Sequence, residues 1–190
     1  MFVLHQLQQI PVNWNVLRSE FDNSYPKESF DFNDPNNIPV ESVLVYCCGI
    51  LHESKMFCFT LQFAEYCLDL PVDCELQILL SQLDKLVGFL RQPTEQEVVV
   101  DLYEQGCEYK IIFSRSSGLI RVAVDSRERQ ESVKCQVRET ELALSVAQLL
   151  LSFIRGVSIL VPEMLKEAAF ETWFTRLMVN TELPVADLSS

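Results

Sequence analysis

The chain has 190 residues, of which 48% are hydrophobic and 22% charged, and its 27 acidic residues against 15 Lys and Arg give a net charge of −12. A chain of this size and apolarity can bury one substantial core, so we expect a single domain over residues 1–180. The negative charge repels phosphate backbones and anionic lipids, which disfavours nucleic acids and membranes as partners and favours a basic protein.

The sequence shows no membrane-spanning stretch and no secretion signal. Its apolar runs are interrupted well before the ~20 residues that a spanning helix needs, and the N-terminus lacks a basic leader. The seven cysteines are an odd number and lie inside apolar stretches, as is typical of reduced, buried thiols. We therefore expect a cytoplasmic protein.

Residues 22–41 (DNSYPKESFDFNDPNNIPVE) are predicted to form a long acidic surface loop, because they combine prolines, asparagines and acids without a sustained period. Acids can steer a basic partner, and aromatic residues can supply contact area. The alternative is that the aromatic residues anchor the loop to the core. The candidate partner-binding residues in this loop are Asp22, Tyr25, Asp31, Phe32, Asp34 and Glu41.

Residues 42–63 are predicted to form a buried β-hairpin that turns at His52–Lys55, since they are β-branched, aromatic or cysteine almost throughout. In that hairpin Cys47 and Cys58 share one face, and Cys48 lies on the other. Three sulfurs then cannot converge on one ion, and the spacing of these cysteines does not match a zinc site. We expect no metal here.

The next segments alternate between helical and strand patterns. Leucine and valine recur at three- and four-residue spacing before Pro93, which predicts an amphipathic helix that starts at Pro71 or Asp73. Residues 97–104, 107–115 and 119–125 are predicted to form an antiparallel meander, to which 133–137 adds a further strand.

Two helices are predicted to close the fold. Residues 140–155 are apolar almost all round and should form the most buried helix, ending at Gly156. A last helix is predicted over 161–180, followed by a mobile tail at 181–190. Glu163, Glu167 and Glu171 recur every four residues on this last helix, which makes them either a solvated face or a docking surface for a cationic partner.

The net charge is positive between Lys110 and Arg138, where the sequence contains seven Lys and Arg residues and three acids. Lys110, Arg115 and Arg121 are candidates for holding an anion. A basic hairpin that pairs with the chain's own acids is the equally economical alternative.

Motifs for catalysis are sparse. The chain has two histidines, no G-x-S-x-G elbow and no glycine-rich phosphate loop. No catalytic residue and no cofactor is therefore expected.

Together these patterns predict an α+β fold, with an antiparallel sheet of about five to seven strands packed with three main helices. The favoured function is a non-catalytic protein-binding protein whose acidic surface engages a basic protein, for which a bacterial toxin-neutralising (immunity) protein is the sharpest version. One alternative is a small-molecule-binding or enzymatic domain in which the basic hairpin holds an anion. The other is a subunit or assembly factor that packs through its last helix.

Overall fold

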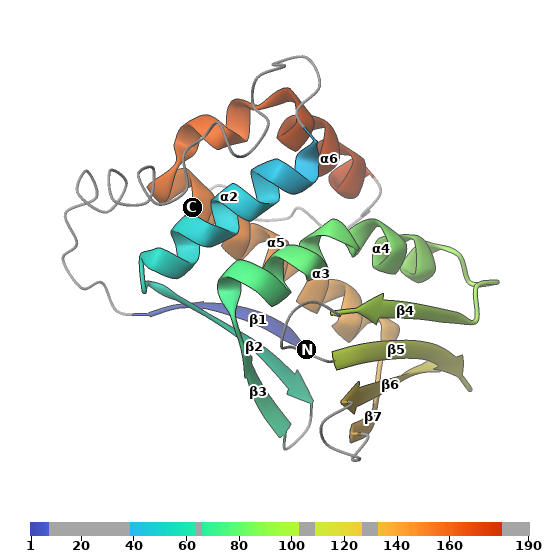
Figure 1. Cartoon of the computed structure of the whole chain (residues 1–190). Helices are drawn as coiled ribbons and strands as arrows, with labels where there is room; N and C mark the ends of the chain where they lie inside the picture. Colours follow the sequence, from blue (N-terminus) through green and yellow to red (C-terminus); the bar gives the residue numbers. More distant parts are fainter. Residues whose placement is uncertain (8–38, 64–65, 103–108, 127–132, 180–190) are drawn as a thin grey trace, which may run out of the picture.

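The computed structural model describes residues 1–7, 39–63, 66–102, 109–126 and 133–179 (Figure 1). These residues form two antiparallel sheets and a set of helices, so the α+β class is confirmed. Seven strands occur among the described residues, within the predicted range of about five to seven, but they divide into a sheet of three and a sheet of four where one sheet was predicted. In Figure 1 the helices α2, α3, α4 and α6 lie on one side of the two sheets.

The first sheet has the order β1-β2-β3, with β1 (Phe2–Gln6), β2 (Phe57–Phe63) and β3 (Tyr66–Leu70). Phe2 pairs with Leu61 and Leu4 with Phe59, so alternate side chains of β1 and β2 enter the core from one face. Neither β1 nor β3 was predicted from the sequence. Each has only five residues, too few for alternation to be informative.

The second sheet has the order β4-β5-β6-β7 and contains the predicted meander. Its strands are β4 (Glu97–Asp101), β5 (Tyr109–Ser116), β6 (Leu119–Ser126) and β7 (Val133–Val137). β5 and β6 are joined by Ser117 and Gly118, both with positive φ (53° and 82°), which is the two-residue turn whose twist suits a hairpin. The rings of Phe2 and Phe113 pack 6.2 Å apart and join the two sheets through the core.

Helix α2 (Val40–Glu53) stands where the sequence predicted the first strand of a hairpin, so that prediction was wrong. Val43, Leu44, Cys47, Cys48 and Leu51 are buried, and their spacing of one and three residues places them on one side of a helix. A helix buried over most of its circumference has the same apolar composition as a strand buried on both faces. The hydrophobic pattern alone therefore does not distinguish the two, and the strand prediction for this segment was wrong. Only Phe57–Phe63 of the proposed hairpin is a strand.

The helix predicted to start at Pro71 or Asp73 and to end before Pro93 changes its geometry once and is interrupted once. It begins as a π-helical turn, η2 (Val72–Leu76), continues as α3 (Gln77–Ser81), breaks at Gln82 and ends as α4 (Leu83–Arg91). At the break, the Gln82 side chain donates to Asp101 O at 2.7 Å and accepts from Asp101 N–H at 3.2 Å. Gln82 thus satisfies backbone groups at the outer edge of β4, which no strand of the described residues pairs with.

Helix α5 (Glu139–Leu160) runs past Gly156 instead of ending there. A Cβ at Gly156 would lie 2.7 Å from Leu51 Cδ2 of α2 and 3.0 Å from Phe57 Cζ of β2. Gly156 is therefore a close-approach position between helices and not a helix stop. In Figure 1, α5 passes behind α2, and at its other end the Ser145 hydroxyl accepts from Phe2 N–H at 2.9 Å.

The last predicted helix is divided as well. Residues Pro162–Lys166 form a 3-10 helix, η3, Glu167 has an extended backbone, and α6 covers Ala168–Val179. Phe170 and Trp173 of α6 pack on Phe153 of α5, with ring centroids 6.3 and 6.4 Å apart. The tail at 181–190 and most of the 22–41 loop lie outside the described residues, and the single-domain boundary at 180 stays a prediction.

Within the described part of the chain, α5 is the one helix that is long and apolar enough to cross a bilayer. In this structure 44% of the tested window is buried inside the fold. Because a core helix meets the same two criteria, length and composition do not distinguish the cases.

Candidate functional site

The three basic residues predicted to hold an anion do not converge. Arg115 and Lys110 are five residues apart on β5. Because successive side chains of a strand alternate between its two faces, these two point to opposite faces of the sheet. Lys110 pairs with Asp101 and Asp125 in neighbouring strands, which surrounds it with acids. Arg121 is exposed and lies opposite Ser114.

Arg115 is held by the fold itself. Its guanidinium contacts Glu139 of α5 at 2.6 and 3.2 Å, and it donates to the carbonyl oxygens of Phe89 (2.8 Å) and Glu95 (3.1 Å). It also stacks 4.6 Å from the centroid of the Phe89 ring. With 15% of its side chain exposed, Arg115 joins α4, β5 and α5, and most of its donors are already committed.

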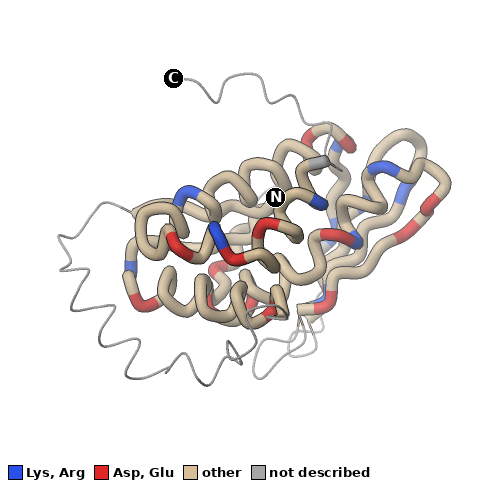
Figure 2. Tube along the Cα trace, turned by 90° about the horizontal axis from the view of Figure 1, so that it is seen from above, with Lys and Arg blue, Asp and Glu red and all other residues tan. Residues whose placement is uncertain are grey.

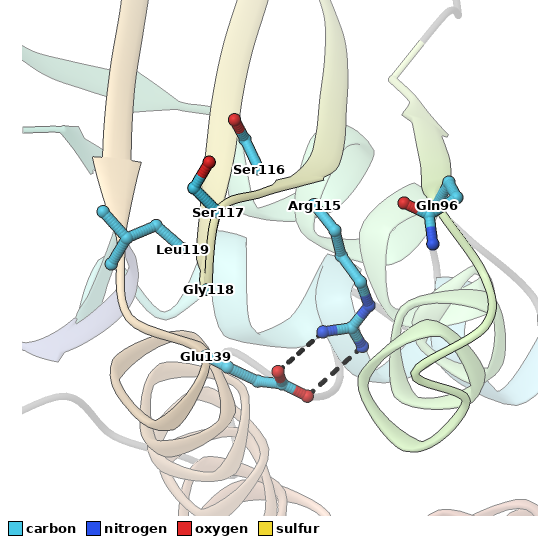
Figure 3. A pocket seen from close by; sticks show the side chains of 7 residues that line it. All are labelled: Gln96, Arg115, Ser116, Ser117, Gly118, Leu119 and Glu139. Carbon is cyan, nitrogen blue, oxygen red and sulfur yellow. Dashed lines mark hydrogen bonds and ion pairs between the residues drawn. The ribbon is translucent and has the colours of Figure 1, made fainter.

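A pocket of about 160 Å³ lies beside this ion pair (Figure 3). Figure 3 shows Arg115 and Glu139 pointing toward one another, while the hydroxyls of Ser116 and Ser117 point away from them. A neutralised pair with no converging polar groups gives an incoming anion little to bind. The following residues line the pocket: Gln96, Arg115, Ser116, Ser117, Gly118, Leu119 and Glu139.

The cysteines do not form the hairpin arrangement expected from sequence. Cys47 and Cys48 are buried in α2, where burial raises the pKa of both thiols, and Cys58 lies on β2. Cys67 and Cys74 are exposed, contrary to the expectation that the cysteines are buried. Cys107 is outside the described residues, and among those that are described no three His, Cys, Asp or Glu side chains are grouped to hold a metal ion.

Two polar features near α2 were not predicted. His52 Nδ1 lies 3.3 Å from Asp73 Oδ1, which links the last turn of α2 to η2. Two residues later, Glu75 is only 3% exposed and its Oε2 has no hydrogen-bond partner. Unpaired buried carboxylates are rare, but a single one without converging groups does not define a chemistry.

Of the acidic and aromatic residues predicted to bind a partner, some lie in the described part of the chain and others do not. Asp22, Tyr25, Asp31, Phe32 and Asp34 lie outside the described residues. Glu41 belongs to the first turn of α2 and is exposed, so the predicted loop ends before it.

Glu163, Glu167 and Glu171 do not form one helical stripe, because the chain leaves helical geometry at Glu167. The described residues hold 15 of the 27 acids and 11 of the 15 Lys and Arg, for a net of −4. Figure 2 shows the two signs interspersed along the described trace. The larger part of the negative charge therefore belongs to residues outside that trace.

The most distinctive described surface is on α5, which the sequence analysis expected to be the most buried helix. Leu144, Leu151 and Ile159 expose 55%, 39% and 40% of their surface. No charged residue occurs between Glu141 and Arg155, although solvated helix faces normally carry charges. The exposed faces of α4 and α6 follow that norm, with Lys85 on the former and Glu171 on the latter.

One row of residues along the outward side of α5 follows a spacing of four and three, and the exposed Gln148, Arg155 and Ile159 lie beside this row. We call this row the α5 seam: Thr140, Leu144, Ala147, Leu151, Ile154 and Ser158. Four of the six are exposed, and Ala147 and Ile154 are half-buried. This period is the one by which two helices pack along their lengths. The sequence signal for the α5 seam was the absence of charge over thirteen residues. A fully buried helix shows the same absence of charge.

Comparison with known proteins adds no further assignment: no family model, curated protein or solved structure matches this chain.

Proposed function

We propose that the protein is a non-catalytic protein-binding subunit that docks through the α5 seam onto a helix carrying a complementary apolar seam. The observation that carries this proposal is the exposure of Leu144 and Leu151, one heptad apart within a stretch of α5, residues 142–154, that contains no charge. One alternative from the sequence was a subunit or assembly factor that packs through its last helix, and this proposal names α5 as the packing helix instead. The apolar residues of α6, Phe170, Trp173 and Leu177, are buried in the chain's own core.

The energetics favour a docked seam. Leaving large apolar side chains in water forgoes about 25 cal/mol for each Å² that a partner would cover. Solitary exposed leucines are common, but apolar residues that recur at helical spacing without an intervening charge are typical of interfaces. The α5 helix is also firmly anchored by Gly156, Ser145 and Phe153, so the seam is presented on a rigid element.

The test compares Leu151→Lys with Val45→Lys. Both residues are 39% exposed, and both substitutions add one positive charge, but Val45 lies on α2. Chromatography of native source-cell extracts should show the wild type and Val45→Lys in an assembly larger than the 21.9 kDa chain. Leu151→Lys should elute at the size of the single chain. Identical elution of all three proteins at the monomer position would refute the proposal.

The acidic-surface function is the second candidate. Its support is the net charge of −12 and the position of Glu41, whose end of α2 lies beside α6 in Figure 1, the helix that carries Glu171. Two acids far apart in sequence thus lie on neighbouring elements. A toxin-neutralising role is the sharpest form of this function, because an acidic protein can cover the phosphate-binding surface of a cationic nuclease.

Salt dependence tests this second candidate. Capture of a basic protein should weaken as salt rises, because charge steering is screened over about 10 Å at 0.1 M salt. Glu171→Lys should weaken the same capture. Capture that is insensitive to both changes would contradict an acidic docking surface.

A further inference from the structure

We infer that the occupant of the α5 seam is a second copy of this chain, bound with the two α5 helices antiparallel about a two-fold axis. This inference rests on the proposed function, since it names the partner for the same surface. It is argued from the order of side-chain sizes and charges along the seam.

The sizes along the seam are self-complementary. When two identical helices pack antiparallel, a seam residue near the start of one helix faces a seam residue near the end of the other. With the axis level with residue 149, Leu151 faces Ala147 of the second copy and Leu144 faces Ile154 of the second copy. The large Leu151 thus meets the smallest side chain in the seam. The remaining layer, Thr140 against Ser158, places two small hydroxyl residues at the ends.

The charges beside the seam are self-complementary as well. Glu141, Gln148 and Arg155 follow one another at seven-residue spacing along one border of the seam. In the antiparallel arrangement this border faces itself in reverse. Glu141 then lies opposite Arg155 of the second copy, twice per dimer, and the neutral Gln148 meets its own copy beside the axis. A parallel arrangement would pair neither charge.

The contacts within one copy leave this border available. Arg155 is exposed, and the side chain of Glu141 is 40% exposed although it already pairs with Arg138. A carboxylate can accept more than one donor, so Glu141 can keep its contact with Arg138 and also accept from Arg155. No acid lies within the seam itself, which leaves a basic partner without a charge to bind there.

Salt separates this dimer from a complex with a basic protein. Two copies of charge −12 repel one another, and salt screens that repulsion while leaving apolar contact intact. Dimerisation should therefore tighten as salt rises, whereas capture of a basic protein should weaken.

The experiment is sedimentation of the purified full chain over a range of concentrations at low and high salt. The wild type and Val45→Lys should dimerise. Leu151→Lys should weaken dimerisation about 100-fold or more, because the symmetric dimer loses this anchor twice. Arg155→Glu should weaken it about tenfold by reversing two exposed pairs, whereas Lys166→Glu, which changes the net charge equally, should not.

A cross-link tests the orientation. Gln148→Cys, treated with a short bis-maleimide, should yield a peptide that joins position 148 to itself, because only the antiparallel arrangement places the two copies of this position on the same side of the seam, next to the axis.

The outcomes separate the dimer from the proposed function. A monomeric wild type overturns the inference, and so does a dimer without the 148–148 cross-link. A monomeric purified chain whose larger assembly in extracts still requires Leu151 overturns the dimer alone. If Leu151→Lys changes neither measurement, both proposals fail.

Discussion

Gly156 of α5 lies so close to Leu51 of α2 that a Cβ at position 156 would come within 2.7 Å of Leu51 Cδ2. Gly88 of α4 is also helical, but nothing lies within 4 Å of the position that its Cβ would occupy. The two glycines therefore separate the packing role of glycine from its effect on helix propensity.

Gly88→Ala should raise the free energy of unfolding by about 1 kcal/mol, because alanine favours the helix and restricts the unfolded chain. Gly156→Ala gains the same propensity but must displace two packed side chains, which costs about 1–3 kcal/mol. It should be neutral or destabilising. Urea denaturation of the two variants measures the difference, and equal stabilisation by both would contradict the close contact.

The clamp around Arg115 should be sensitive to shape as well as to charge. Arg115→Lys keeps the charge but cannot reach Glu139 and the carbonyl oxygens of Phe89 and Glu95 together. We expect a loss of about 1–3 kcal/mol in the free energy of unfolding, with Arg115→Met at the upper end. Arg121→Lys, on an exposed position, should stay within about 0.5 kcal/mol of the wild type.

The same clamp predicts that inorganic phosphate does not bind at Arg115, since its donors are committed. A phosphate titration followed by NMR should leave the amide signals of Arg115, Ser116 and Ser117 unchanged. Saturable shifts at these residues would restore the anion-binding hypothesis.

Thiol reactivity should follow burial. Burial raises the pKa of the Cys47 and Cys48 thiols, so little thiolate is present at neutral pH and the reagent reaches them only when α2 opens. Iodoacetamide should label the exposed Cys67 and Cys74 first, by at least about tenfold in rate. Peptide mass spectrometry identifies the sites, and early labelling of Cys48 would show that α2 is not buried as described.

The N-terminus of α5 should give stability that depends on pH. Hydrogen bonds from the Arg138 backbone N–H and guanidinium lower the pKa of Glu141 from its ordinary value of 4.5. A lowered folded-state pKa stabilises the fold above pH 4.5, and that stabilisation is lost as pH falls through the folded value. Glu141→Gln should therefore lower the Tm at pH 7 and converge with the wild type in acid.

Arg138→Ala is the matched control for this prediction. It keeps the backbone hydrogen bond and removes the guanidinium, so it should reproduce only part of the effect of Glu141→Gln. A Tm difference that does not change with pH would contradict the assignment.

The meander could be predicted from sequence because its strands pair with their neighbours in the chain. Ile120, Val122 and Val124 alternate with more exposed residues, and Ser117–Gly118 supplies the turn, so local pattern and tertiary structure agree. The hairpin prediction at 42–63 failed because a helix buried nearly all round shows no polar face. Cys47 and Cys48 could not separate the two cases, since cysteine is accepted in either.

The candidate site was harder to predict than the fold. Arg115 was found as a charged residue, but its partner Glu139 is 24 residues away, and only the tertiary structure brings the first turn of α5 to the end of β5. Leu144 and Leu151 were found as apolar residues and assigned to the core. Their exposure depends on which side of α5 the sheets and α2 leave uncovered, and no local pattern contains that information.

The sequence by itself determined the α+β class, the antiparallel meander and the excess of acid, because these follow from residue period and composition over short distances. Only the tertiary structure decided that residues 40–53 are helical, that Arg115 is a clamp and that one side of α5 faces outward. The physical reason is that hydrophobicity specifies that a side chain would gain by burial, whereas the arrangement of all the elements decides which side chains the fold buries and which remain for a partner.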